Sequence, residues 1–284
     1  MPSFTSWIRL FRPANALIAA AAVWLGWYSL RLRPEAWLAL WGSLSMLLLV
    51  AAGNADNDVR DVETDRINRP SRPIPSGRIT VGAARAASIL LYASAVALAW
   101  IGSPFHGGLA LAMALLLGLY NRFLKGLPLS GNLAVSLLCG LAVYFVELPL
   151  LIDFPLEAHD SLPAALFAFL ATFAREVVKD AEDLAGDRAA GHRTFAVTAG
   201  IGAARKLAFA TVALMLALLP FPALLFGYGR AYSLAVIVLA GPLVFLLLRE
   251  LSRPAADFSK AQKLLKLLML AGMVALLAGV MGRG

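Results

Sequence analysis

The sequence has few of the residues that mark secreted, zinc-binding or ordinary soluble proteins. It contains one cysteine, Cys139, which lies in an apolar run, so a disulfide framework is excluded and a buried thiol is expected. Its three histidines have no ligand spacing to one another and no HExxH motif is present, so no zinc site is predicted. Only 15% of the residues are charged, whereas about a quarter are charged in a typical soluble domain.

Apolar residues, by contrast, make up 60% of the chain. Several runs approach or exceed the ~18 apolar residues that predict a membrane-spanning helix. Helix breakers separate nine predicted spans, near residues 14–31, 36–57, 80–101, 107–121, 131–150, 162–179, 205–226, 231–249 and 263–281. We therefore expect an all-α polytopic membrane protein in which about nine transmembrane helices form one bundle around a central cavity. No separate soluble segment is visible, so residues 1–284 are expected to form a single domain.

The distribution of basic residues predicts how the spans are oriented. The net charge of +8 alone would be compatible with nucleic-acid binding. Threading the spans from a cytoplasmic N-terminus, however, places 21 of the 25 Lys and Arg residues on the cytoplasmic side. The residues left outside are Arg31, Arg33, Arg230 and Arg283. This bias follows the positive-inside rule, so we expect a plasma-membrane protein surrounded by lipid, with a cytoplasmic N-terminus and no nucleic-acid partner. No oligomeric state is predicted.

An acidic pattern, D-x-x-D-x-x-x-D, occurs twice in the chain. The two triplets are Asp58, Asp61 and Asp65 and, 122 residues later, Asp180, Asp183 and Asp187. Both close a span that runs from outside to inside, because four spans separate them. Positions i, i+3 and i+7 of a helix lie within about a 60° arc, so each triplet is predicted to point its carboxylates at one place. Asn54 and Glu176 fall on the same faces.

Inserting such carboxylates into a membrane costs free energy, about 2.5–3.5 kcal/mol for one Asp at the centre of a spanning helix. They are therefore expected at the wet cytoplasmic end of a cavity, sharing cations, or both. Oxygen ligands without His or Cys favour Mg²⁺, Mn²⁺ or Ca²⁺. Two facing triplets predict a diphosphate clamped between Mg²⁺ ions. For either triplet alone, a solvated acidic face at a helix end is the alternative.

Basic and amide side chains accompany the triplets. The segment 66–80, RINRPSRPIPSGRIT, is a proline-broken loop beside the first triplet, and guanidinium groups bind phosphate oxygens in a bidentate manner. The predicted diphosphate-binding residues are Arg66, Arg72, Arg78, Lys125 and Lys179. Some of this charge has an alternative role in setting the membrane orientation. The predicted substrate-binding residues are Asn15, Asn54, Tyr120 and Asn132.

These segments resemble the UbiA-type superfamily of intramembrane prenyltransferases. The resemblance rests on Asn57-Asp58-x-x-Asp61-x-x-x-Asp65, on the second triplet, and on a helix pattern that extends along nearly the whole chain. It implies a prenyl diphosphate donor, a lipid-like acceptor and a Mg²⁺ cofactor. The implied metal ligands are Asn57, Asp58, Asp61, Asp65, Asp180, Asp183 and Asp187, with Asp61, Asp65, Asp183 and Asp187 also catalytic.

Three stretches resemble one branch of that superfamily, the digeranylgeranylglyceryl phosphate synthases. They are RLFRPANALIA (9–19), NRPSRPIPSGRI (68–79) and REVVKDAEDLAGDRAAG (175–191). The resemblance implies transfer of a geranylgeranyl group to geranylgeranylglyceryl phosphate in ether-lipid synthesis. Because chlorophyll synthases share a segment similar to NRPSRPIPSG, a tetrapyrrole or an aromatic quinone precursor stays open as the acceptor. A secondary transporter with a cytoplasm-facing acidic cluster, or a membrane scaffold without activity, is the alternative outside enzymes.

Overall fold

The computed structural model describes residues 3–31, 34–153 and 159–282, and every regular element in this part is a helix. The first half contains α1 (Phe4–Phe11), α2 (Pro13–Ser29), α3 (Ala36–Arg60), α4 (Val62–Asn68), α5 (Val81–Gly102), α6 (Pro104–Leu119), the π-helix η1 (Tyr120–Leu124), α7 (Ser130–Tyr144) and α8 (Leu150–Asp153). The second half contains α9 (Leu162–Glu182), α10 (Leu184–Ala189), α11 (Phe195–Ala199), α12 (Ile201–Leu218), α13 (Phe221–Phe226), α14 (Arg230–Ala235), the π-helix η2 (Val236–Ala240), α15 (Gly241–Ser252) and α16 (Phe258–Met281).

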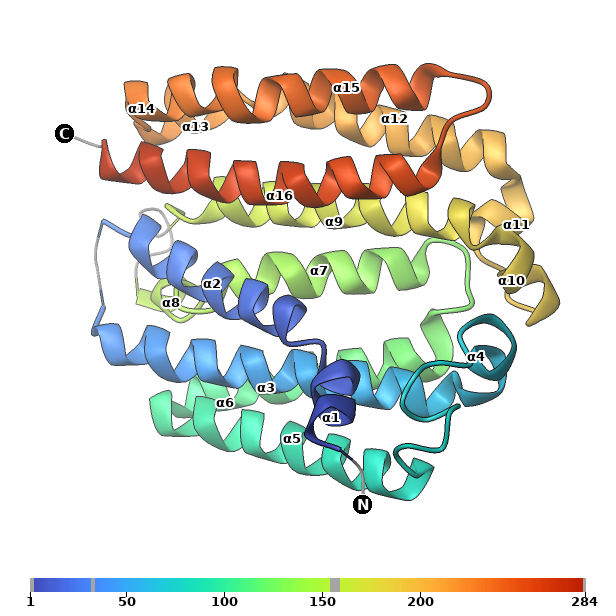
Figure 1. Cartoon of the computed structure of the whole chain (residues 1–284). Helices are drawn as coiled ribbons and strands as arrows, with labels where there is room; N and C mark the ends of the chain where they lie inside the picture. The colour runs from blue at the N-terminus through green and yellow to red at the C-terminus, as the bar shows by residue number, and fades with distance from the viewer. Residues whose placement is uncertain (1–2, 32–33, 154–158, 283–284) are drawn as a thin grey trace.

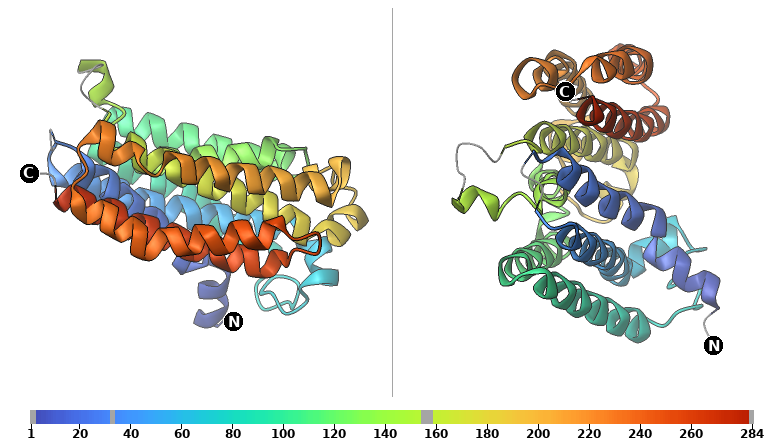
Figure 2. Two further views of the ribbon diagram at one scale, coloured as in Figure 1. Left: turned by 90° about the horizontal axis from the view of Figure 1, so that it is seen from above. Right: turned by 90° about the vertical axis from the view of Figure 1, so that its left-hand side faces the viewer.

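The long helices lie side by side in a bundle (Figure 1). Short helices α4, α10 and α11, which follow the two acidic motifs, gather at one end of that bundle. Helix α8 and the end of α16 lie at the opposite end, and α1 projects from the side of the bundle (Figure 2). Both acidic segments therefore share one end, as the even number of intervening spans predicts.

Six described helical segments are long and apolar enough to cross a membrane. A seventh is added if α1 and α2, which meet at 50°, are counted as one span. Each of the nine predicted ranges overlaps helical segments, but the range 131–150 extends past the end of the 15-residue α7 at Tyr144, and α9 carries the charges of the second motif. Several long membrane-spanning helices are thus present, whereas nine crossings remain a prediction. Of the residues used to predict orientation, Arg33 and Arg283 lie outside the described ranges.

Among the described residues, the buried core consists of four apolar clusters, and the three largest lie among the long helices. One joins α9, α12, α15 and α16, and a second joins α2, α3, α5, α6 and α7. The third, which includes Leu25, Val143 and Leu276, connects α2, α7 and α16 and so links the two halves of the bundle. Outside these clusters, large apolar side chains face outward, such as Leu224 at 77% exposure. An exterior of this kind suits lipid rather than water.

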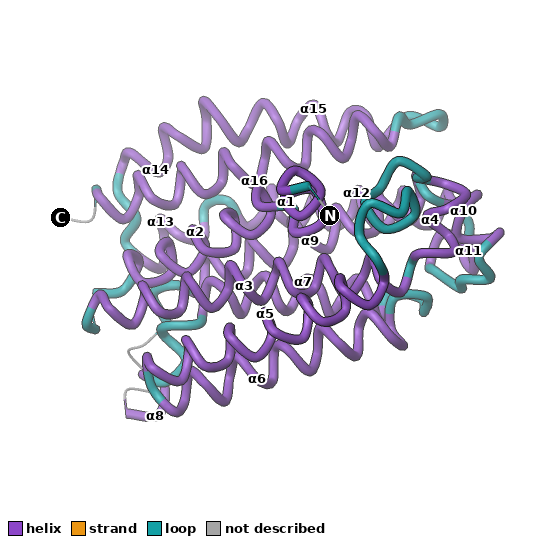
Figure 3. The backbone as a smooth tube through the Cα atoms, turned by 60° about the horizontal axis from the view of Figure 1, so that its bottom comes forward, coloured by secondary structure: helices purple, strands orange, loops and turns teal. Residues whose placement is uncertain are grey.

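Close contact between helices depends on small residues at particular positions. A Cβ atom at Gly26 of α2 would lie 1.8 Å from the carbonyl oxygen of Val143 in α7. The two backbones are therefore in direct contact, as is common where membrane helices pack through glycine. Helix starts are also specified locally, since the hydroxyls of Thr80 and Ser103 accept backbone N–H groups at the beginnings of α5 and α6. Thr80 and Ser103 thus mark the starts of α5 and α6, which pack against each other in the backbone trace (Figure 3).

Candidate active site

The first acidic motif lies where α3 ends and α4 begins. Asp58 belongs to the last turns of α3, Asp61 is the residue between the two helices, and Asp65 lies in α4. At Asp61 the backbone departs from helical geometry, with φ −85° and ψ 5°. Its side chain does not cap α4 and is therefore available for other contacts.

The second motif repeats this geometry. Asp180 lies in the last turn of α9, Asp183 is the junction residue with φ −87° and ψ 7°, and Asp187 lies in α10. The expectation that each triplet occupies one face of a continuous helix is therefore wrong. Both helices break at the middle aspartate, so the third carboxylate follows a change of chain direction. The two motifs thus share their backbone conformation as well as their sequence pattern.

The outer aspartates of the first motif are paired with arginines. Arg12, which joins α1 to α2 in a left-handed conformation, donates to Asp58 and, at 3.4 Å, to the side-chain oxygen of Asn54. One nitrogen of Arg72, Nη1, lies 3.2 Å from Asp58 Oδ1 and 2.5 Å from Asp65 Oδ2. A single guanidinium nitrogen therefore bridges the first and third carboxylates of the triplet.

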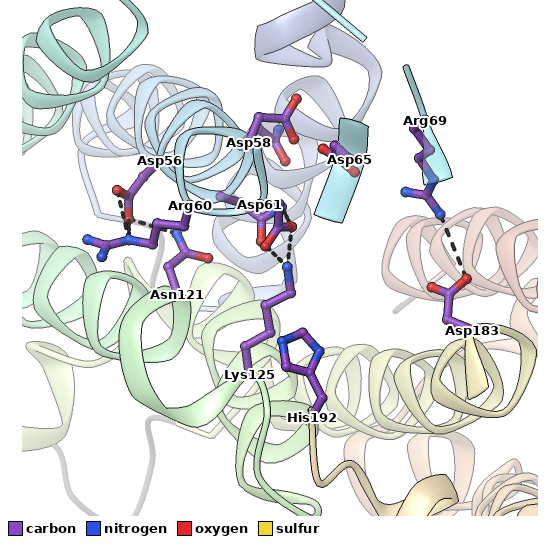
Figure 4. Close-up of polar contacts among 12 residues, drawn as sticks. Asp56, Asp58, Arg60, Asp61, Asp65, Arg69, Asn121, Lys125, Asp183 and His192 are labelled. Carbon is purple, nitrogen blue, oxygen red and sulfur yellow. Dashed lines mark hydrogen bonds and ion pairs between the residues drawn. The ribbon is translucent and has the colours of Figure 1, made fainter. Parts of the chain in front are cut away.

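The middle aspartate of the first motif is paired with Lys125. This lysine follows η1, where the chain winds as a π-helix, and its ammonium donates to Asp61 and, at 2.9 Å, to Asn57 Oδ1. Asn57 in turn donates to Asp61 Oδ2 at 2.9 Å. Burial lowers the pKa of the Lys125 ammonium, while the neighbouring Asp61 carboxylate acts in the opposite direction. Lys125 is thus a partly buried cation, aimed at the motif (Figure 4).

The second motif is held by amide and ammonium groups. Asn132 near the start of α7 donates to Asp180 Oδ2 at 2.9 Å. Glu176, one turn earlier on α9 and 6% exposed, accepts from Arg175 at 2.8 Å and from Lys179 at 3.4 Å. Lys179 therefore lies beside this motif with Glu176 as its nearest carboxylate, and its role in diphosphate binding remains a prediction.

Two contacts link the segments around the motifs. Arg69, in the loop after α4, lies 3.8 Å from Asp183 and so joins the first motif's loop to the second motif (Figure 4). Tyr120 lies between the motifs and interacts electrostatically with Lys179 and Glu176 on one side and Asp61 on the other. The two acidic segments thus form one site at the shared end of the bundle.

The described acidic, histidine and cysteine side chains do not form a group of three close enough to hold a metal ion. The pairings explain this arrangement, because Arg12, Arg72 and Lys125 occupy carboxylate oxygens that a metal ion would use. The available donors are nevertheless carboxylate and amide oxygens, and Mg²⁺ prefers such oxygens together with water and phosphate. The donor set therefore fits Mg²⁺.

Three predicted site residues lie elsewhere in this structure. Arg66 pairs with Glu63 at 2.7 Å on the surface, and Arg78 donates to the backbone of Ser71, where it shapes its own loop. Asn15 is exposed near the start of α2, and no side-chain contact joins it to the acidic residues among the described parts of the chain. Their predicted roles in binding remain predictions.

Other residues take part in the site although sequence reasoning did not assign them to it. Arg12 pairs with Asp58 of the first motif, and Arg69 with Asp183 of the second, although neither arginine is among the predicted diphosphate-binding residues. Asp187 accepts a hydrogen bond from Thr194 at 3.2 Å and lies 3.3 Å from the ring of His192. His192 lies only five residues after Asp187, and this short separation is a local signal for their contact. A search for metal-binding histidines considers only the spacing between histidines and therefore misses it.

One known protein family matches this chain. The model of the UbiA prenyltransferase family matches residues 16–277. The chain belongs to the UbiA prenyltransferase family. This membership confirms the family predicted from the two motifs and makes the protein a prenyltransferase. A UbiA-family relative, the digeranylgeranylglyceryl phosphate synthase of Methanopyrus kandleri, is 34% identical over 280 residues, covering 97% of this chain and 99% of the relative.

Solved structures of the family have the same fold. A structure of digeranylgeranylglyceryl phosphate synthase superposes on this UbiA-family chain with a TM-score of 0.75 and 26% identity, covering 99% of both chains. A UbiA homologue from Archaeoglobus fulgidus, whose structure contains GPP and Mg²⁺, superposes with a TM-score of 0.69 and 17% identity, covering 95% of this chain and 99% of the homologue. That homologue supports the fold of the present chain.

Proposed function

We propose that this protein transfers a geranylgeranyl group from geranylgeranyl diphosphate to the free hydroxyl of geranylgeranylglyceryl phosphate. The observation that carries the proposal is the convergence of both acidic motifs on one site, with Arg69 reaching Asp183 across it. Relatives that carry the synthase name align with almost the whole chain, so the acceptor-binding parts have counterparts as well. The site lies at the end of the bundle, whereas a secondary transporter places its acids near the bilayer midplane.

The residues proposed to hold Mg²⁺ are Asn57, Asp58, Asp61, Asp65, Asp180, Asp183 and Asp187. When bound, Mg²⁺ neutralises charge on the diphosphate oxygens and thereby makes diphosphate a better leaving group. Lys125 and Arg72 now bind carboxylate oxygens. On substrate binding they would transfer these hydrogen bonds to phosphate oxygens, which are equally good charge-assisted acceptors. Lys179, which pairs with Glu176 beside the second motif, would do the same there.

The proposed reaction exchanges one carbon–oxygen bond for another. The bond between C1 of the prenyl chain and the diphosphate oxygen breaks, and the electron pair leaves with diphosphate. The acceptor hydroxyl oxygen bonds to C1 and gives up its proton to the released diphosphate, forming an ether. Tyr120 and Asn132 lie where they can orient the reacting groups, and Asn54 supports the site through Arg12. Apolar helix walls around a central cavity would exclude water from the cation-like C1.

Purified full-length protein tests the proposal directly. Geranylgeranyl diphosphate and Mg²⁺ would be supplied with geranylgeranylglyceryl phosphate, with an aromatic quinone precursor or with a chlorophyllide, and products identified by mass spectrometry. We expect diphosphate release and an ether product only with the glyceryl phosphate. Transfer to an aromatic carbon or a tetrapyrrole instead would replace the proposed acceptor. No transfer to any acceptor would contradict the proposed function.

The proposed location is the plasma membrane, with both motifs facing the cytoplasm.

A further inference from the structure

A second polar site lies on the other side of α3 from the acidic motifs. A pocket of about 410 Å³ is lined by Asp56, Val59 and Arg60 of α3, by Arg85 of α5 and by Arg122 of η1. Asp56 and Asp58 are two positions apart in a helix and so point about 200° apart. Figure 4 accordingly shows Asp56, Arg60 and Asn121 grouped away from Asp58, Asp61 and Asp65. The pocket volume falls within the ~300–1,000 Å³ of ordinary small-molecule sites.

The charges in this pocket favour an anion. Its one carboxylate, Asp56, already accepts hydrogen bonds from Arg60 at 3.1 Å and from Asn121 at 3.0 Å. Arg85 and Arg122 have no carboxylate partner among the described residues, and both are exposed. Two guanidinium groups therefore face the pocket without a counter-ion from the described part of the chain, and guanidinium groups bind phosphate oxygens readily.

The position of the pocket favours an anion that is attached to a lipid. It lies where α3 ends, where α5 begins and where α6 passes into η1, which is the motif-bearing end of these membrane-spanning helices. Ile89 follows Arg85 by one turn on α5 and is 60% exposed, and Leu119 precedes Arg122 by three residues and is 45% exposed. Ile89 and Leu119, here called the apolar strip, thus lie on the membrane-spanning side of the two arginines.

We propose that the pocket between α3, α5 and η1 binds the phosphate of an anionic membrane lipid, whose acyl chains lie along the apolar strip. The bound lipid is distinct from the prenyl acceptor. If a lipid phosphate occupies this pocket, α3 lies between the lipid headgroup and the acidic motifs. A hydroxyl group on that headgroup would then not reach the transfer site. The inference does not rest on the proposed reaction, since it concerns the opposite face of α3.

Native mass spectrometry of the full-length protein tests this site. The detergent-solubilised protein would be titrated with dioleoyl phosphatidylglycerol, with dioleoylglycerol, which lacks phosphate, and with inorganic phosphate as a competitor. We expect one phosphatidylglycerol to be retained per chain, no retention of dioleoylglycerol and no displacement by millimolar phosphate. Retention of dioleoylglycerol to the same extent would overturn the phosphate assignment, and full displacement by inorganic phosphate would indicate a soluble anion instead of a lipid.

Paired variants locate the binding. The double variant Arg85→Gln/Arg122→Gln is expected to weaken retention about fivefold per arginine, or about 25-fold in all. The control Arg249→Gln/Lys263→Gln removes the same charge from exposed positions at the same end of the bundle and should have little effect. Equal losses in both variants would show a diffuse surface effect. Displacement of phosphatidylglycerol by geranyl diphosphate would place the lipid in the transfer site. Either result would refute the proposal, and melting temperatures would confirm that both variants are folded.

Discussion

Replacement of Lys125 by Met tests whether the cation between the motifs acts on the leaving diphosphate. Methionine has a similar length and fills the same partly buried space, but it lacks the ammonium group that bonds to Asn57 and Asp61. If that ammonium binds phosphate during the reaction, the variant loses stabilisation that increases as negative charge develops on the leaving group. We therefore expect kcat to fall more than KM rises.

The magnitude follows from the number of hydrogen bonds. A hydrogen bond to a charged group contributes about 1.5–3 kcal/mol, and each 1.36 kcal/mol corresponds to a tenfold change in rate. Loss of one such bond to diphosphate therefore predicts a decrease in kcat/KM of roughly 10- to 150-fold. In the resting protein Asn57 continues to donate to Asp61 at 2.9 Å, so the fold should be retained.

Steady-state diphosphate release at saturating Mg²⁺ measures this effect. Lys206→Met, which removes an exposed lysine from the same end of the bundle, is the matched control and should keep wild-type kinetics. Lys125→Arg should restore part of the rate, since it restores the charge. A value of kcat/KM within threefold of wild type for Lys125→Met would refute a role for this cation in the reaction. A decrease in kcat/KM caused entirely by a higher KM would also refute this role, because it would indicate that Lys125 contributes to substrate binding alone.

Three further predictions concern the motifs and the metal. Asp61→Ala and Asp183→Ala should each abolish turnover while the proteins stay folded, because each removes a proposed ligand and leaves the apolar clusters intact; activity near the wild-type kcat would exclude that motif from catalysis. Removal of divalent ions with EDTA should stop prenyl transfer and added Mg²⁺ should restore it, so undiminished transfer in EDTA would exclude metal dependence. Cysteines introduced at Ser71 and Ala190 in a Cys139→Ser background should both resist an impermeant maleimide until cells are permeabilised, whereas labelling at only one would place the motifs on opposite sides of the membrane.

The helices could be predicted from sequence because their signals are local. Apolar runs, a proline at Pro104 and caps such as Thr80 act within a few residues of the boundary they set. The shared location of the motifs was also predictable, since it requires only an even number of crossings between them. The number of full crossings was harder to predict, because α7 has 15 residues and α9 combines an apolar stretch with charged residues.

The site was less predictable because its pairings join distant segments. Arg12 reaches Asp58 across 46 positions and Lys125 reaches Asp61 across 64. Each basic residue has several acidic partners available in the sequence, so only the packing of α2, α3 and η1 selects among them. Arg66 illustrates the ambiguity, because it neighbours Asp65 in sequence but pairs with Glu63, one helical turn away.

The break at the middle aspartate explains why a simple helical face is the wrong description of each motif. On a continuous helix with a rise of 1.5 Å per residue, positions i and i+7 would lie about 10.5 Å apart along the axis. A single ion with bonds of about 2.0–2.1 Å does not join carboxylates at that separation. In this structure Arg72 Nη1 contacts both Asp58 Oδ1 and Asp65 Oδ2, at 3.2 and 2.5 Å. The change of direction at Asp61 therefore brings the outer carboxylates within reach of one cationic nitrogen. Asp183 has nearly the same φ and ψ, so the chain departs from helical geometry at the corresponding residue of the second motif.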